Sequence, residues 1–181
     1  MHPRTEELLR HLDDTRAALR ATVASIPSSL RNTRPAHDRW SIAEVIEHLS
    51  RVESGLTRLL ASKLADARQT GLLEPDLNAS AIDGLVDRRL LDRTRRIVAG
   101  ERVIPRGEMD ADQALSALDS ARQALRELLI AHDGINLGLV RHPHPVLGEI
   151  DGYQWFAFIG THEARHTDQI REIEETLSRR E

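Results

Sequence analysis

The segment that follows Trp40 has the clearest helical signature in the chain. Ser41 is a typical N-cap residue, and Glu44, three residues later, is its usual partner in a capping box. Apolar residues then recur at intervals of three and four, at Ile42, Val45, Leu49, Val52, Leu56, Leu60 and Leu64. A helix with so long an apolar stripe has to bury it against other helices, because no segment of the chain alternates with the period of a β-strand.

Three further segments carry the same helical periodicity, at about residues 5–26, 110–134 and 151–178. The connection 71–107 contains prolines and glycines, and within it residues 85–98 predict a shorter helix. Four amphipathic helices of this kind favour an all-α fold. The sequence therefore predicts a four-helix bundle with a long connection between its second and third helices.

The chain has 181 residues, which suits one domain spanning 1–181 with its own hydrophobic core. Between the third and fourth predicted helices, residues 141–145 read Arg-His-Pro-His-Pro. Two prolines so close together indicate a rigid loop, because each fixes its own backbone and restricts the residue before it.

Composition narrows the chemistry and the partners. The chain has no cysteine, so any metal ligands have to be His, Asp or Glu. A net charge of −4 argues against nucleic-acid binding, and the one basic cluster, at 88–96, is interpreted as a solvated helix face. No apolar run approaches the roughly 20 residues of a membrane helix. The N-terminal residues lack the apolar core of a signal peptide, so we expect a cytoplasmic protein with no membrane partner.

His162 and His166 stand four residues apart in the last predicted helix, where one turn of rise lets both imidazoles reach a single ion. They fall near the middle of an apolar stripe formed by Trp155, Ile159, Ile170, Ile173 and Leu177. A buried polar group without a partner costs about 1–3 kcal/mol. A shared metal ion removes that cost for both rings at once. The alternative is a pair of histidines that hydrogen-bond separately to other helices.

His48, at the edge of the apolar stripe of the second helix, is the candidate third ligand. The bare pattern His-Glu-x-x-His is that of zinc proteases, with Glu163 as the base. Such a protease needs a further ligand downstream, yet only 15 residues follow His166 and none is histidine. It also holds its substrate against a sheet edge, and the sequence predicts no strand. The sequence thus favours a metal site and argues against a protease.

The motifs resemble those of the DinB-like superfamily of metal-binding four-helix bundles, over nearly the whole chain. The resemblance rests on three stretches, Trp-Ser-Ile-Ala-Glu-Val-Ile-Glu-His-Leu at 40–49, His-Pro-Val-Leu-Gly to Gly-Tyr-Gln-Trp at 144–155, and His-Glu-Ala-Arg-His to Gln-Ile at 162–170. It implies a four-helix bundle, often a homodimer, with a divalent metal held by three histidines. These ligands correspond here to His48, His162 and His166.

The resemblance also implies a range of activities on small-molecule substrates. Members of the superfamily include transferases and an isomerase that use a low-molecular-weight thiol, bacillithiol or mycothiol, and presumed metal-dependent hydrolases. Three neutral imidazoles leave an ion its full charge and an open position, which can activate water or bind a thiol as thiolate. Zn²⁺ suits such ligands, and Ni²⁺, Fe²⁺ and Mn²⁺ also accept them. The alternative is a non-catalytic bundle whose ion is structural or sensory.

Four other residues are weighed for the same site. Glu44 and Glu163 are candidates for accepting an imidazole N–H or a proton, although each also has an ordinary place on its helix. Arg165 could meet an anionic substrate, but an exposed arginine is the default interpretation. His144 is interpreted as structural and kept as a candidate for lining a pocket.

Overall fold

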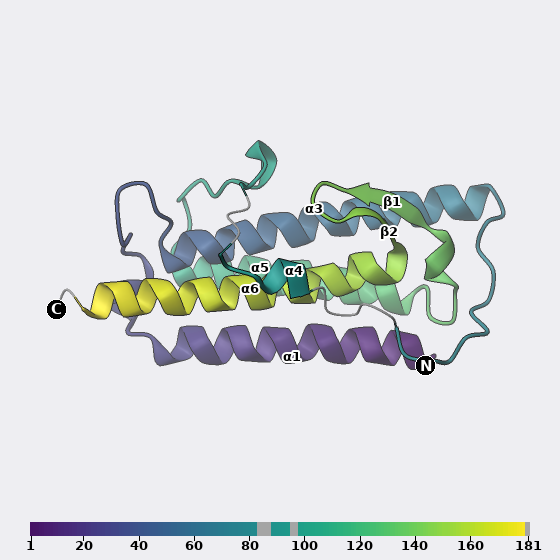
Figure 1. Cartoon of the computed structure of the whole chain (residues 1–181), viewed down its shortest axis with the longest axis horizontal. Helices are drawn as coiled ribbons and strands as arrows, with labels where there is room; N and C mark the ends of the chain where they lie inside the picture. The colour runs from purple at the N-terminus through teal and green to yellow at the C-terminus, as the bar shows by residue number, and fades with distance from the viewer. Residues whose placement is uncertain (83–87, 95–97, 180–181) are drawn as a thin grey trace.

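The structure is a computed structural model that describes residues 1–82, 88–94 and 98–179. Its four long helices are α1 (Pro3–Ser25), α3 (Ile42–Gln69), α5 (Ala111–Ile130) and α6 (Gly152–Ser178). They run alongside one another parallel to the long axis of the molecule (Figure 1). α3 packs mainly on α5, α1 packs mainly on α6, and α3 also contacts α6. The predicted four-helix bundle is confirmed.

Capping residues explain where three of these helices begin. Each starts with a capping box, in which the N-cap side chain accepts a hydrogen bond from the N3 backbone N–H and the N3 side chain accepts one from the N-cap backbone N–H. The boxes are formed by Ser41 with Glu44, Asp110 with Gln113, and Asp151 with Gln154. The end of α3 at Gln69 agrees with the predicted start of the connection at 71. The predicted helix 110–134 is too long at its end, because α5 stops at Ile130 and Gly134, with a positive φ of 75°, belongs to the turn that follows.

The long connection between α3 and α5 holds two short helices, α4 (Arg88–Leu91) and the 3₁₀ helix η1 (Glu101–Val103). The predicted helix 85–98 is therefore only partly seen. Residues 92–94 are not helical, because the Asp92 side chain accepts the backbone N–H of Thr94 and turns the chain. Residues 83–87 and 95–97 lie outside the described part. Two other short helices are α2 (Ser28–Arg31) and the 3₁₀ helix η2 (Leu137–Leu139).

The prediction of no strand, with a loop at 141–145, was wrong. Strand β1 (Arg141–His144) pairs with β2 (Gly148–Asp151) in an antiparallel hairpin that leads directly into α6. Strands of four residues are too short to show a period of two, and the proline at 143 argues against a strand. Gly148, at a φ of 78°, lets the chain turn back tightly. The indole N–H of Trp155 donates to the His142 carbonyl at 3.1 Å and ties the hairpin to α6.

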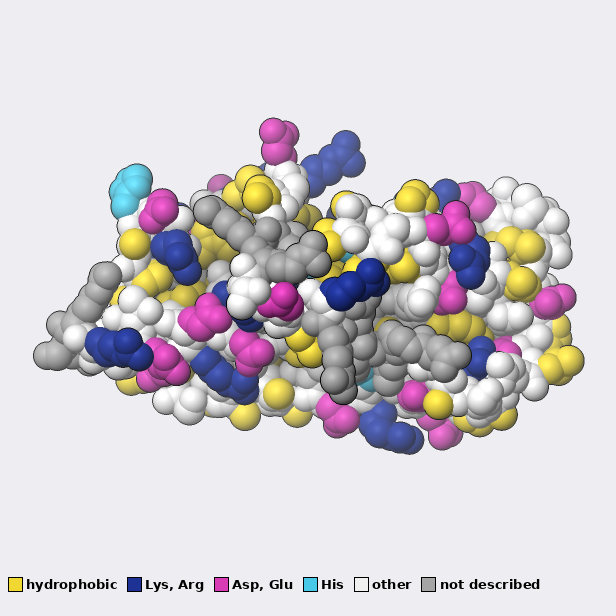
Figure 2. Space-filling model, viewed as in Figure 1, with side chains coloured by type: hydrophobic (Ala, Val, Ile, Leu, Met, Phe, Trp, Pro, Cys, Tyr) yellow, Lys and Arg dark blue, Asp and Glu magenta, His cyan; other side chains and the backbone are white. Residues whose placement is uncertain are grey.

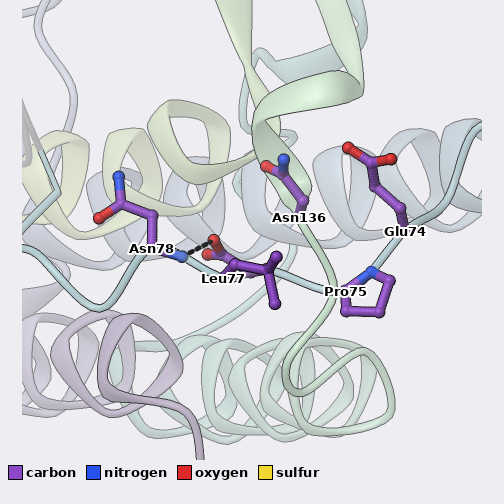
Figure 3. Close-up of a pocket in the computed structure, with 6 residues that line it drawn as sticks. Glu74, Pro75, Leu77, Asn78 and Asn136 are labelled. Atoms are coloured by element: carbon purple, nitrogen blue, oxygen red, sulfur yellow. Dashed lines mark hydrogen bonds between the residues drawn. The ribbon is translucent and has the colours of Figure 1, made fainter.

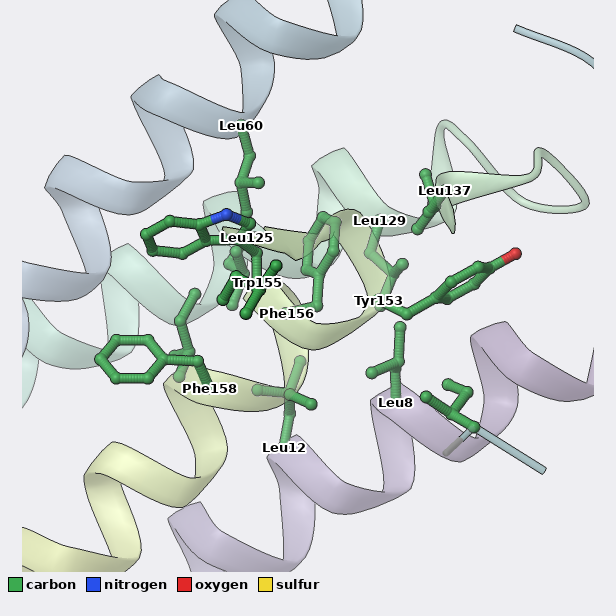
Figure 4. Packing of buried hydrophobic residues seen from close by; sticks show 14 of the residues in the cluster. Leu8, Leu12, Leu60, Leu125, Leu129, Leu137, Tyr153, Trp155, Phe156 and Phe158 are labelled. Carbon is green, nitrogen blue, oxygen red and sulfur yellow. The ribbon is translucent and has the colours of Figure 1, made fainter. Parts of the chain in front are cut away.

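Two hydrophobic clusters fill the bundle. The one nearer the hairpin carries the aromatic side chains of α6 against leucines of α1, α3 and α5 (Figure 4), including Leu8, Leu12, Leu60, Leu125, Tyr153, Trp155, Phe156 and Phe158. The other cluster is aliphatic and includes Leu19, Val23, Ile42, Val45, Ile46, Leu118, Ile170 and Ile173. The two clusters thus occupy different levels along the same four helices.

A network of four buried charges lies between these clusters, and each long helix contributes one member. Arg16 of α1 donates to Glu163 of α6 at 2.9 Å and to Glu53 of α3 at 3.2 Å. Arg122 of α5 donates to Glu53 at 2.6 Å and also to Glu163. Two positive and two negative charges thereby satisfy one another inside the bundle. Because a buried charge without its partner is strongly destabilising, the network fixes how the helices align along the axis.

Acidic and basic side chains are interspersed on the molecular face shown in Figure 2. In the described part of the chain, no helix is both long enough and apolar enough to cross a bilayer.

We expect Arg122→Met to lower the free energy of unfolding by about 3–5 kcal/mol, because it leaves Glu53 and Glu163 buried with one arginine between them. Arg126→Met, one turn further along α5, removes a partly exposed pair with Asp13 and should cost about 1 kcal/mol or less. Urea unfolding at neutral pH measures both. Equal losses in the two variants would show that the network does not constrain the fold.

Candidate metal centre

Three histidines from two helices meet on one side of the bundle. His48 comes from α3, and His162 and His166 come from α6. Each offers a ring nitrogen, and these atoms lie within 4.8 Å of one another. The Nε2 atoms of His162 and His166 are 3.1 Å apart. The structure therefore brings together the three residues that the sequence singled out as ligands.

The buried network and the histidines depend on the same helix alignment. Glu163 follows His162 directly in α6, and Glu53 lies five residues after His48 in α3. Since both glutamates bind the same two arginines, sliding α3 along α6 would break these ion pairs and also separate His48 from the pair on α6. The ion pairs between helices thus position the three histidines.

Two of the three imidazoles are held in the form that a metal needs. His48 Nδ1 donates to the Val103 carbonyl at 2.7 Å, and His166 Nδ1 donates to Gln169 Oε1 at 2.7 Å. With Nδ1 protonated, the Nε2 of each neutral ring carries a lone pair. Sequence reasoning missed both partners. The spacing of Gln169, three residues after His166 on one helix, could have indicated it, whereas a backbone carbonyl from the distant 3₁₀ helix leaves no sequence signal.

The protein interior keeps these imidazoles neutral. Burial lowers the pKa of His48, against the opposing effect of its hydrogen bond to Val103. Burial also lowers the pKa of His162 well below its usual 6.5 and that of His166 to about 3, with the neighbouring histidines adding to both shifts. At neutral pH the site therefore consists of uncharged nitrogen donors, as metal coordination requires.

The donor set fits a divalent metal ion. In a tetrahedral zinc site with Zn–N bonds of about 2.0–2.1 Å, two ligand nitrogens lie about 3.3 Å apart. The separation of 3.1 Å between His162 Nε2 and His166 Nε2 is close to this value. Imidazole nitrogens without thiolates also suit Ni²⁺, Fe²⁺ and Mn²⁺, so the ligand type admits several metals.

Aromatic rings surround the histidines. The Trp40 ring lies 5.0 Å from that of His48, and Phe158 stacks on His162 with centroids 5.3 Å apart. His144 of the hairpin packs on Phe158 at 4.4 Å and on Trp155 at 5.0 Å. These rings place apolar surface next to His48 and His162. They also make the hairpin part of the wall around the site.

His144 is bound within the hairpin itself. Its Nδ1 accepts the backbone N–H groups of Val146 and Leu147, at 3.1 and 3.2 Å. Burial lowers the pKa of His144 to about 4, so its ring is neutral at physiological pH. These contacts agree with its interpretation as a structural histidine.

The two carboxylates considered as bases lie elsewhere. Glu44 completes the capping box with Ser41 and accepts from Arg34. Glu163, the other candidate, is 1% exposed and belongs to the buried network. Both carboxylates are thus engaged by arginines and not by the three histidines. Glu163 instead acts on the site through helix alignment.

Arg165, taken by default as exposed, is in fact 5% exposed. Its guanidinium donates to the carbonyls of Leu90 and Asp92, both at 2.7 Å, and so binds the segment around α4 to α6. The sequence could not indicate this role, because its acceptors are backbone atoms more than seventy residues away.

An open pocket of about 440 Å³ lies away from the histidines, beyond the end of α3. Its lining is shown in Figure 3 and consists of Glu74, Pro75, Asp76, Leu77, Asn78 and Asn136. The helical rise puts about 30 Å between His48 and Gln69 at the end of α3, before the pocket begins. Asp76 is occupied by Tyr153, which donates to it, and by Arg4 at 3.5 Å. This pocket is separate from the histidine cluster.

Known proteins share this sequence pattern and this fold. The uncharacterised protein YuaE of Bacillus subtilis is 29% identical over 149 residues, which cover 82% of this chain and 85% of that protein. The crystal structure of TT2238, a four-helix bundle protein, superposes with a TM-score of 0.58 at 21% identity, over 93% of this chain and 98% of the other, and so shares the fold. The family model of the DinB superfamily matches residues 11–170, a span that includes all three histidines. The chain belongs to the DinB superfamily.

Proposed function

We propose that the protein is a divalent-metal-dependent enzyme acting on a small molecule, with His48, His162 and His166 as the metal ligands. The observation that carries this proposal is the convergence of three neutral imidazoles from two helices, with their donor atoms within 4.8 Å of one another. The hydrogen bonds of two rings to Val103 and Gln169 support it, because they leave Nε2 free to coordinate.

A divalent ion bound by three neutral ligands supplies a Lewis acid that lowers the pKa of a bound water or thiol. The reaction is then either hydrolysis of the substrate or transfer of a group from the substrate to a low-molecular-weight thiol. Because the chain has no cysteine, a reacting thiol has to come from a small molecule. Zn²⁺ is the first choice for the ion on ligand type.

The chain's own residues hold and shield the reacting centre. Val103 and Gln169 fix the ring orientations of His48 and His166, which keeps the donors in place without rearrangement. Trp40 packs beside the ring of His48 and Phe158 beside that of His162, and both lower the polarity of the surroundings of the site.

We expect protein purified without an affinity tag to hold about one divalent ion per chain, and His162→Ala to remove it, because two imidazoles bind an ion much less tightly than three. His37→Ala, at an exposed histidine outside the site, should leave the metal content unchanged. Elemental analysis of the three proteins checks this. Full metal content in the His162 variant would refute the assignment of the ligands.

The same preparations test whether the ion is catalytic. Metal-loaded protein is assayed with low-molecular-weight thiols and electrophilic acceptors, and separately with ester and amide substrates, before and after chelation. Activity that is lost on chelation and restored by the ion supports an enzyme. An ion without an exchangeable water, whose removal unfolds the protein, indicates a structural role instead.

Gln169→Leu should weaken metal affinity about 10–100-fold, because it removes the acceptor that fixes the His166 ring. Gln169→Glu keeps an oxygen acceptor and should retain most of the affinity. Competition with a fluorescent chelator measures both variants. If the leucine variant binds the ion as tightly as the native protein, the hydrogen bond is not part of the site.

We expect the metal-free protein to lose stability as the pH falls below about 6.5. Histidines in the unfolded chain take up protons near that pH, whereas burial holds the folded-state pKa of His166 at about 3 and that of His144 at about 4. The unfolded state therefore binds more protons in this interval and is favoured as the pH drops.

Urea unfolding of chelator-treated protein between about pH 7 and pH 5 measures this loss, above the range in which most carboxylates titrate. His166→Gln, which cannot be protonated, should show a shallower dependence on pH than the native chain. Identical slopes for the two proteins would contradict the assigned neutral state of His166.

A further inference from the structure

Three side chains of α3 hold η1 and the segment that follows it. Arg51 Nη2 donates to the Arg102 carbonyl at 3.0 Å, next to the bond from His48 to Val103. The Glu47 carboxylate accepts the backbone N–H groups of residues 106 and 107, at 2.8 and 3.0 Å. This part of the connection is therefore a bound wall beside the metal centre.

An open pocket of about 560 Å³ lies along this wall, distinct from the pocket at the end of α3, and is lined by Arg51, Glu101, Arg102, Ile104, Pro105 and Arg106. The lining thus includes three arginines but only one acidic residue, Glu101. The nearby Glu47 carboxylate is buried, and its oxygens already accept two backbone amides. The pocket keeps an excess of positive charge, which favours an anionic ligand.

Arg51 has donors to spare. Its Nη2 makes the bond to Arg102, and its Nη1 lies 3.8 Å from Glu47, beyond hydrogen-bonding distance. Its Nε is the one buried side-chain polar atom in the described residues that lacks a hydrogen-bond partner. A buried donor without an acceptor is costly, and in a native protein such a donor can mark the place where an ion or ligand binds.

We propose that this pocket binds the anionic oxygen group, carboxylate or phosphate, of a small molecule, with Arg51 as the principal donor and Arg102 and Arg106 as supporting charges. A guanidinium binds such groups through charge-assisted hydrogen bonds, and the Nε–H of Arg51 has no acceptor among the described residues. The Arg51 side chain is 26% exposed, so rotation of its flexible stem can present this N–H to the ligand.

The pocket adjoins the metal centre. Arg51 follows His48 by three residues on α3. Burial lowers the pKa of His48, the hydrogen bond to Val103 raises it, and the positive charge of Arg51 lowers it further by a smaller amount. The proposed anion site depends only on the arginines and does not require a bound metal. Where the proposed metal-dependent function also holds, the pocket selects substrates or thiols that carry a negative charge at a distance from the reacting atom.

Side-chain NMR of the metal-free protein tests this inference without involving the metal. The ¹⁵N–¹H signal of the Arg51 Nε–H, assigned by its loss in Arg51→Lys, is followed while inorganic phosphate or succinate is added. Sodium chloride at matched ionic strength is the reference. We expect a saturable shift with phosphate, with succinate or with both, and the outcome identifies which oxygen group the pocket takes. No shift with either, or the same shift with chloride, overturns the inference.

Charge variants add a second readout. Arg106→Gln should weaken binding of the effective anion about fivefold, the size of one partly screened charge contact. Arg58→Gln, at an exposed arginine on the same helix as Arg51 but outside the pocket, should leave binding unchanged. Equal weakening by both variants means that the anion responds to overall charge and not to this pocket, which refutes the proposal.

Discussion

The ion pairs among Arg16, Glu53, Arg122 and Glu163 are the interaction on which the rest of the structure depends. Apolar stripes alone let helices slide past one another, because leucine packs on leucine at many offsets. Four buried charges, one from each long helix, allow a single offset, since any other leaves a charge unpaired in the interior. The three clustered histidines lie within a few residues of the two glutamates, so the same constraint sets the distance between His48 and the pair on α6.

The long connection between α3 and α5 contributes directly to the candidate site. Its carbonyl at Val103 orients His48, and its arginines form the wall of a positively charged pocket. Residues of α3 hold this segment through backbone atoms, which requires no particular side chains in the connection. Conversely, the α4 region is held on α6 by Arg165, through two carbonyls. Both flanks of the histidine cluster are thus built from segments that the four-helix core alone does not define.

Sequence reasoning succeeded where the signal was local. The capping box of α3 and the apolar stripes predicted the helices and the bundle. The spacing of His162 and His166 predicted that their rings would meet, and the structure places His48 beside them. It failed for the hairpin, whose strands are too short to show alternation, and for the end of α5. It did not foresee the arginine partners of Glu163, and it took Arg165 as exposed by default. Helical spacing says on which face a residue lies but not which groups from distant segments pack against that face.

The sequence by itself determined four amphipathic helices, a histidine pair one turn apart, and a donor set without thiolates. Each of these follows from backbone periodicity or from residue type. The tertiary structure decided the tautomers of His48 and His166, their lowered pKa values, the enclosure of Glu163 and the unpaired Nε–H of Arg51. Most of these properties depend on burial and on partners distant in the chain, and the energy of a buried polar group is set by what packs around it.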